Sequence, residues 1–138
     1  MAILFRLSVC ATLFLLAGCS AHSPLIGMDV TDVERKSEII YDPHPGKIYL
    51  STAMLPEAGN YEVIAKVDVG KAWYGSAQAV YQEMAESARQ LGGDAVYEIH
   101  TWFQPTGWAW AAPHGAGIVI KVNDHRSFVF SDKDGQWL

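Results

Sequence analysis

The sequence is poor in cysteine. Its 138 residues include two cysteines, Cys10 and Cys19, and Cys10 lies in an N-terminal apolar run that we expect to be removed on export. The exported chain would keep one cysteine and therefore have no pair for an internal disulfide. This excludes a disulfide framework and a redox role based on a thiol pair.

Positive charge is also scarce. After removal of residues 1–18, nine Lys or Arg remain against fifteen Asp or Glu, with no block of basic residues. This balance argues against a nucleic-acid partner and against a polybasic membrane patch. The sequence shows no nucleophile elbow, no phosphate-cradling glycine loop and no carboxylate pair placed for acid and base work. We therefore predict that the protein is not an enzyme.

What the N-terminus does contain is an apolar run, LSVCATLFLLAG at residues 7–18, preceded by the cation Arg6. A helix of about twelve residues is too short to span ~30 Å of hydrocarbon. The pattern is typical of a signal peptide and not of a membrane-spanning helix. An ordinary secretory signal that happens to end in Gly-Cys is the alternative.

The end of this run, Leu16, Ala17, Gly18 and Cys19, resembles a bacterial lipobox. The resemblance implies a diacylglyceryl thioether on the Cys19 sulfur, cleavage before Cys19 and acylation of the freed amine. One myristoyl chain binds a membrane only reversibly, with an association constant of about 10⁴ M⁻¹, whereas two or more chains make retention stable. Ser20 stands where aspartate would favour the inner membrane in the resembling systems, so we expect the periplasmic face of the outer membrane.

We expect three parts in the chain: a signal peptide at 1–18, the lipidated cysteine with a tether at 19–46, and one domain at 47–138. The tether mixes charges with prolines and has no sustained period, which predicts a linker with one helical turn around residues 33–39. If it is flexible, its root-mean-square reach is roughly 30 Å. That reach would keep the domain near the membrane.

Within the domain, alternating apolar residues predict strands and a three- to four-residue period predicts one helix. The expected strands are residues 47–52, 61–69, 94–103 and 116–123, with an optional edge strand at 127–130. The expected helix follows Ser76 as N-cap and ends at Gly92 in the left-handed C-terminal position. Its apolar stripe comprises Ala77, Val80, Tyr81, Met84, Ala88 and Leu91.

This order predicts an α+β fold, a two-layer sandwich in ββαββ order with one helix packed on a mainly antiparallel sheet. In the third strand we expect Ala95, Tyr97, Ile99 and Phe103 to face the helix. Before the helix, the aromatic pair in KAWYG, residues 71–75, is expected at the edge of the core.

The helix end and the following strand resemble the small bacterial domain of the YbjQ-type and Rcs stress-sensor lipoprotein superfamily. The matching positions are Ala88, Leu91, Gly92, Asp94, Ala95 and Val96. Because these residues form a helix stop and a strand start, they support fold more than function. The YbjQ-type side of the resemblance implies ring-like oligomers and a link to metals. The Rcs side implies an outer-membrane sensor that reports envelope damage to inner-membrane partners.

One pair of residues is a candidate for metal binding. Glu98 and His100 lie two residues apart on one expected strand face, where they would share a divalent ion or act as a base with its orienting group. The alternative is two solvent-facing residues on a half-exposed strand. The other histidines considered, His44, His114 and His125, form no tight pair in the sequence. Apart from the covalent lipid, we expect no cofactor.

The last candidate is the segment WFQPTGWAWAAPHGAG, residues 102–117, expected to be a loop rich in tryptophan. Trp102, Trp108 and Trp110 would bind a protein partner, stack on sugars or lie among lipid headgroups. Alternatively the loop folds back, and its tryptophans cap the sheet face opposite the helix. We therefore expect a non-catalytic envelope lipoprotein that binds a protein or itself through an aromatic sheet face and loop. A metal-binding or envelope-stress-sensing module is the alternative.

Overall fold

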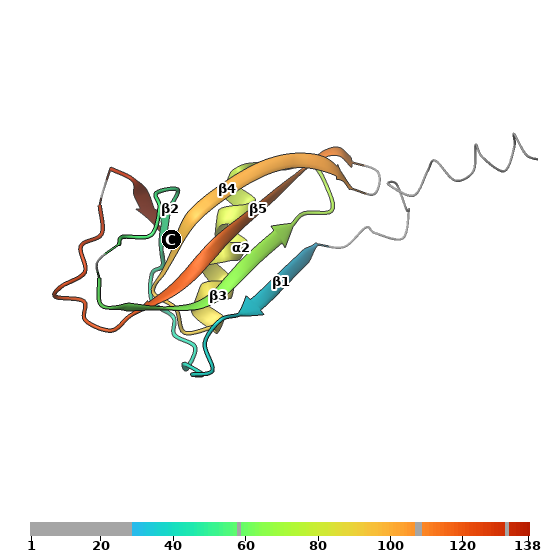
Figure 1. The fold of residues 1–138 in the computed structure, drawn as a ribbon. Helices are drawn as coiled ribbons and strands as arrows, with labels where there is room; N and C mark the ends of the chain where they lie inside the picture. Colours follow the sequence, from blue (N-terminus) through green and yellow to red (C-terminus); the bar gives the residue numbers. More distant parts are fainter. Residues whose placement is uncertain (1–28, 58, 107–108, 132) are drawn as a thin grey trace, which may run out of the picture.

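The computed structural model describes residues 29–57, 59–106, 109–131 and 133–138. The expected signal peptide, the lipidation residue Cys19 and the candidate Trp108 lie outside the described residues. The described part is a sheet-dominated α+β fold, a mixed sheet of six strands with one helix (Figure 1). The elements are β1 (Val30–Arg35), β2 (Tyr49–Ser51), β3 (Tyr61–Gly70), α2 (Ala77–Gln90), β4 (Ala95–Thr106), β5 (Ala109–Val122) and β6 (Gly135–Trp137).

The strands lie in the order β1-β3-β5-β4-β2-β6. The long strands β3, β5 and β4 form the centre of the sheet and pair antiparallel. The short strand β2 pairs parallel with β4 and antiparallel with β6. From Ala65 to Val69, β3 alternates apolar and polar residues, and its apolar residues are buried on the helix side, as the sequence predicts. A register shift between Val63 and Ala65 turns Tyr61 and Val63 to the opposite face, although strict alternation places them on the helix side.

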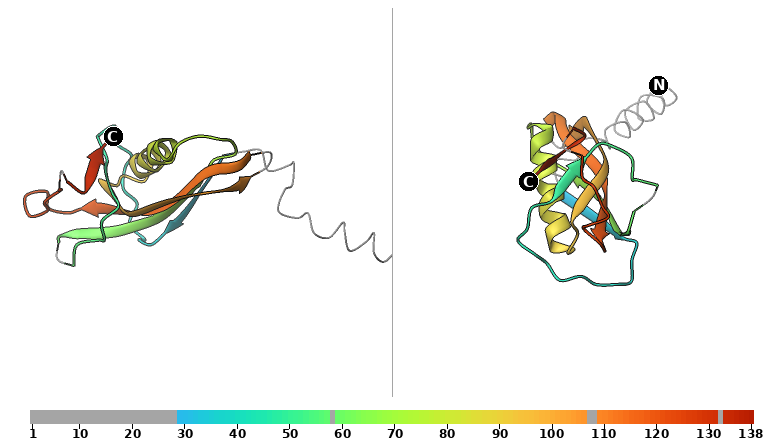
Figure 2. Two further views of the ribbon diagram at one scale, coloured as in Figure 1. Left: turned by 90° about the horizontal axis from the view of Figure 1, so that it is seen from above. Right: turned by 90° about the vertical axis from the view of Figure 1, so that its left-hand side faces the viewer.

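Helix α2 packs against one face of this sheet (Figure 2). The predicted stripe is confirmed at Val80, Met84 and Ala88, whose exposed fraction is 0 %. Burial of a side chain such as Val80 or Met84 contributes roughly 1.5–3 kcal/mol. On β5, Gly115 lets the helix approach closely, because a Cβ there would lie 2.8 Å from Val80 Cγ1.

The ends of α2 agree with the sequence in part. Ser76 occupies the N-cap position, but its side chain makes no capping hydrogen bond; instead its carbonyl accepts the amide of Ala79. Gly92 has a φ of +75°, so the predicted left-handed position is confirmed. The chain then turns directly into β4, where Ala95 begins the next strand.

The opposite face of the sheet has its own apolar cluster. Tyr49, Ala95, Tyr97, Ile120, Val122 and Phe128 form it. The ring of Phe128 packs edge-on against Tyr97, with centroids 6.1 Å apart, and the Tyr49 hydroxyl donates to the Ser131 carbonyl at 2.7 Å. The segment after β5 therefore covers one half of this face. For residues 127–130 the sequence predicts an optional edge strand, but they form a packed coil instead.

The predicted facing of β4 was wrong at its start. Val96 packs in the cluster between α2 and the sheet, whereas Ala95 and Tyr97 pack on the other face; Ile99 faces the helix as predicted. The pairing with β5 shifts between Tyr97 and His100, and Glu98 in this irregularity has a φ of 54°. A bulge reverses the side-chain alternation, which strict periodicity does not anticipate.

The segment expected to be a linker with a helical turn contains a strand instead. Residues 30–35 form β1, which pairs antiparallel with β3 in the register Val30 to Gly70. All six residues of β1 are exposed. Backbone ladder bonds rather than apolar burial hold this edge strand, so its sequence shows no periodic signal. Because β1 and β6 are additional strands, the observed order of elements is longer than the predicted order ββαββ.

Candidate functional site

The segment expected to be a tryptophan-rich loop is part of a long hairpin. β4 extends to Thr106 and β5 starts at Ala109, so the loop prediction was wrong for the residues described here. Pro105 falls at an irregularity in the pairing, between Gln104 and Thr106. The carbonyl of Pro113 accepts the amide of Lys71 at 3.0 Å, just past the end of β3. Prolines are tolerated in a sheet at such bulges and ladder ends.

Trp102 lies between two imidazole rings. Its ring stacks on His100 with centroids 5.5 Å apart and an interplanar angle of 24°. It stacks on His114 at 6.0 Å and 22°. The indole N–H donates to Gln104 Oε1 at 2.9 Å. We call His100, Trp102 and His114 the ring stack; it fixes Trp102 in one orientation with 37 % of its surface exposed.

The ring stack is attached to the sheet through His114. The ring atom His114 Nε2 lies 3.0 Å from the Thr106 hydroxyl, and Nδ1 lies 3.4 Å from the Gln104 amide nitrogen. Burial lowers the pKa of His114, which favours the neutral imidazole. The most buried ring of the stack therefore favours the form without charge. It presents a flat aromatic surface with polar edges.

Glu98 has a structural partner in this fold. Its carboxylate accepts the amide of Leu55 at 3.1 Å, and its own amide donates to the carbonyl of Ala53 at 2.9 Å. These two bonds hold the segment after β2 against the bulge. His100, two residues on, is turned into the ring stack. The metal role of Glu98 and His100 stays a prediction. Among the described residues, no three His, Cys, Asp or Glu are grouped to hold an ion.

Asp94, a residue of the superfamily resemblance, also has local partners. Its carboxylate accepts the amide of Val122 at 2.8 Å and the ammonium of Lys121 at 3.1 Å. His44 and His125 lie 3.8 and 3.9 Å from the same carboxylate. The Lys121 ammonium neutralises the Asp94 carboxylate, and the bonds to Lys121 and Val122 connect the start of β4 to the end of β5. Asp94 therefore has a structural role in this fold.

The geometry of Glu98 predicts a difference between two substitutions. Glu98→Ala should lower the free energy of unfolding by about 1–2 kcal/mol, because the Leu55 amide loses its acceptor and the left-handed backbone strain remains. Glu98→Gly loses the same bond but relieves roughly 1 kcal/mol of strain, so it should be the more stable of the two. Urea denaturation measures both. Equal stability of the two variants would contradict this expected difference.

A second group of aromatic side chains surrounds the end of the hairpin. Trp73, Tyr74, Phe103 and Trp110 are exposed to 59, 52, 56 and 70 %. The rings of Trp73 and Tyr74 pack edge to face at 5.6 Å, and the Trp110 amide donates to the Tyr74 hydroxyl at 3.2 Å. We call these four residues the aromatic tip. The expected core-edge position of Trp73 and Tyr74 was wrong, since both are more than half exposed.

The sequence contains one signal for this tip, which is a long segment without charged residues. No Asp, Glu, Lys or Arg occurs between Glu98 and Lys121. In a hairpin, such a segment brings uncharged residues of both strands to the same end. The absence of charged residues therefore points to an uncharged hairpin end only once these residues are known to form strands.

Beside the aromatic tip lies a small charged cluster that fixes the start of the described chain. Asp29 accepts the Ala72 amide at 2.8 Å and the Lys71 ammonium at 2.9 Å, and Lys71 also binds Glu83 at 3.2 Å. The hydrogen bond from the Ala72 amide, which has the larger effect, and the one from the Lys71 ammonium lower the pKa of Asp29 below its usual value. Burial lowers the pKa of Lys71, but the bonds to Asp29 and Glu83 outweigh it and raise that pKa.

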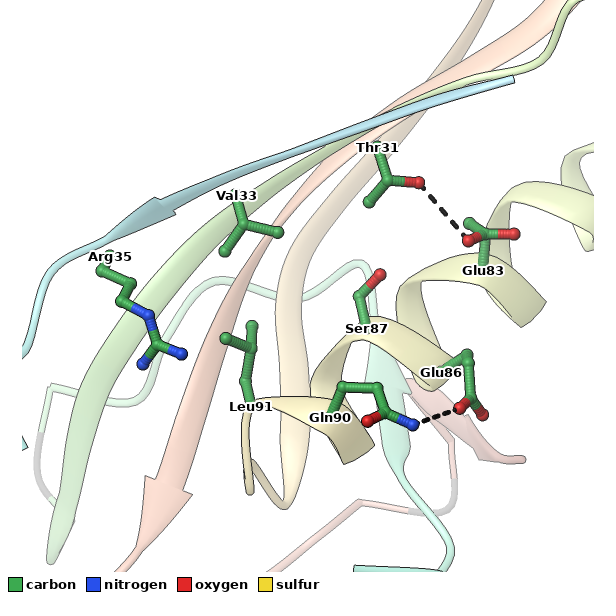
Figure 3. A pocket seen from close by; sticks show the side chains of 8 residues that line it. All are labelled: Thr31, Val33, Arg35, Glu83, Glu86, Ser87, Gln90 and Leu91. Atoms are coloured by element: carbon green, nitrogen blue, oxygen red, sulfur yellow. Dashed lines mark hydrogen bonds between the residues drawn. The ribbon is translucent and has the colours of Figure 1, made fainter. Parts of the chain in front are cut away.

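A groove with a volume of 670 Å³ lies between β1 and α2 (Figure 3). Val33 and Leu91 form its apolar middle, and Arg35 and Glu83 belong to its charged rim. The Thr31 hydroxyl donates to Glu83 at 3.4 Å across one end. Because the rim has both signs of charge, the groove favours no single class of charged ligand.

No protein-family model, curated protein or solved structure matches this chain. None of the described helices is long and apolar enough to cross a membrane. The features of this chain that bear on function are therefore the lipobox-like residues 16–19, the ring stack and the aromatic tip.

Proposed function

We propose that this chain is a non-catalytic lipoprotein of the cell envelope that binds a protein partner or a second copy of itself. Fatty chains on Cys19 would hold it at the periplasmic face of the outer membrane, as the lipobox resemblance implies. We also propose that its domain is a two-layer sandwich with a ββαββ core, formed by β2, β3, α2, β4 and β5. Envelope-stress sensing, implied by the superfamily resemblance, would be one use of such a partner.

The observation that carries the binding proposal is the ring stack. Residues in binding hot spots are often large aromatic side chains held in place before the partner arrives. Trp102 meets this description, since it lies between His100 and His114 and its N–H is bound to Gln104. A side chain that is already ordered loses little conformational entropy on binding. Trp102 lies on the half of the sheet face that the segment around Phe128 does not cover.

A photo-crosslinking amino acid placed at position 68 in living cells tests this proposal, because Asp68 and His100 both pair with Ala116 and replacing Asp68 leaves the three rings of the stack in place. We expect a discrete adduct, either with an envelope protein or with a second copy of the chain. The adduct should fall at least tenfold in Trp102→Ala. In Trp110→Ala it should persist, because that ring lies at the aromatic tip and not in the ring stack. A probe at Val129, which is 84 % exposed, serves as the position control.

The result that would contradict the proposal is equal crosslinking in Trp102→Ala and in the native chain. Absence of any adduct at position 68 would contradict it as well. Circular dichroism of Trp102→Ala shows whether the variant keeps its fold. Because Trp102 is partly exposed, we expect a folded protein.

A further inference from the structure

The aromatic tip and the start of the described chain lie at the same end of the domain. Asp29 is bound to Lys71 and Ala72, which directly precede Trp73 and Tyr74. The end of the β4–β5 hairpin extends past α2 at this end, while the C-terminus lies at the opposite end (Figures 1 and 2). The described chain therefore begins beside the most exposed aromatic rings among the described residues.

The distance from this entry point to the expected anchor is limited by covalent geometry. Cys19 and Asp29 are ten residues apart, so at most about 35 Å separates them. A strand of 14 residues such as β5 (Ala109–Val122) is itself longer, about 45 Å at 3.3 Å per residue. A lipid on Cys19 would thus hold the aromatic tip near the bilayer, while the other end of the domain is free to lie much farther away.

The chemistry of the tip suits a bilayer surface. Trp and Tyr rings are favoured at the membrane–water interface, where one part of the ring is apolar and the other is wet. Insertion of the hairpin end would desolvate no formal charge, because no Asp, Glu, Lys or Arg lies between Glu98 and Lys121. Next to the tip, the Lys71 ammonium forms ion pairs with the carboxylates of Asp29 and Glu83, so this cluster has a net charge of −1 and all three of its charges are paired.

We propose that the aromatic tip inserts into the headgroup layer of the membrane that holds the lipid anchor, so that the domain stands on this membrane with the hairpin end down. This inference rests on the proposed lipidation of Cys19. It deepens the proposed function, because it fixes which surfaces remain for a protein partner. The ring stack and the β1–α2 groove would then face the periplasm from the side of the domain.

The test uses the full acylated protein, purified from membranes and reconstituted in vesicles of phosphatidylethanolamine and phosphatidylglycerol. A nitroxide is attached at Ala111→Cys, an exposed position of β5 that leaves all four tip rings in place. Val129→Cys, at the other end of the molecule, is the matched control. Relaxation by oxygen, which concentrates in lipid, is compared with relaxation by a water-soluble nickel complex.

We expect the ratio of oxygen to nickel relaxation to be several-fold higher at position 111 than at position 129. Trp73→Ser with Trp110→Ser, in the Ala111→Cys background, should return the label at 111 to the value at 129. Retention on the vesicles after a salt wash is measured on the same samples. The acyl chains should keep the double variant bound.

Each other outcome has a defined meaning. Protein that stays on the vesicles with equal ratios at 111 and 129 overturns the insertion of the tip and leaves the anchor intact. Protein that washes off overturns the lipid anchor and the tip proposal together. A label at 111 that is shielded from both reagents shows a protein contact at the tip, which also overturns the proposal.

Discussion

Gly92→Ala should lower the free energy of unfolding by about 3 kcal/mol, which sums a left-handed backbone cost of roughly 1–2 kcal/mol and an overpacking cost of similar size. The backbone at Gly92 has a φ of +75°. A Cβ added there would lie 2.5 Å from the Tyr41 Cβ and 2.7 Å from the Asp42 carbonyl oxygen. Both neighbours belong to the segment that crosses the end of α2, so neither moves without displacing backbone.

Gly75→Ala is the matched control for this effect. A Cβ at Gly75 would lie 3.4 Å from Pro113 Cγ, an ordinary contact, and its φ lies outside the left-handed region. Urea denaturation followed by circular dichroism should show a loss below about 1 kcal/mol for this variant. If Gly92→Ala unfolds at the same urea concentration as Gly75→Ala, the helix end described here is wrong.

Cys19→Ala should move the protein from the membrane fraction to the soluble periplasmic fraction. The lipobox chemistry needs the thiol, so this variant would receive no diacylglyceryl group. The rest of the chain offers little to replace it, because the exported part has an excess of acidic residues and no basic block. The aromatic tip alone buries only a few rings. We therefore expect near-complete release after a high-salt wash.

Cys10→Ala provides the matched control, since Cys10 lies within the apolar run and is expected to be discarded with the signal peptide. This variant should stay in the membrane fraction like the native protein. Immunoblots of pelleted and soluble fractions, before and after the wash, measure both variants. Retention of Cys19→Ala, or release of Cys10→Ala, would contradict the assignment of the anchor.

How well the sequence predicted the fold depended on how each element is stabilised. The helix and the strand β3 are amphipathic, so their periodicity predicted both elements, and the glycine after the helix predicted its end. A register shift in β3 puts Tyr61 and Val63 on the other face, which the periodicity did not predict. The edge strands β1 and β6 were not predicted. β1 is exposed along its whole length and β6 has three residues, so neither carries an apolar alternation.

The sequence identified residues of the candidate surfaces, but it did not predict how these residues are arranged in space. The segment from Trp102 contains two prolines and three glycines before Ile118, which favoured a loop over a hairpin. The stack of Trp102 on His114 joins two strands, and sequence spacing within one strand does not report it. The bulge at Glu98 depends on a left-handed backbone at a non-glycine residue, which tertiary contacts with Ala53 and Leu55 hold in place.

The most direct test of the proposed lipid anchor is the intact mass of the mature protein extracted from its native membrane, with fragmentation of its N-terminal peptide. We expect a chain that begins at Cys19, with a diacylglyceryl group on the sulfur and an acyl chain on the amine. An unmodified Cys19, or an N-terminus at any other residue, would contradict both the anchor and the membrane-facing orientation of the aromatic tip.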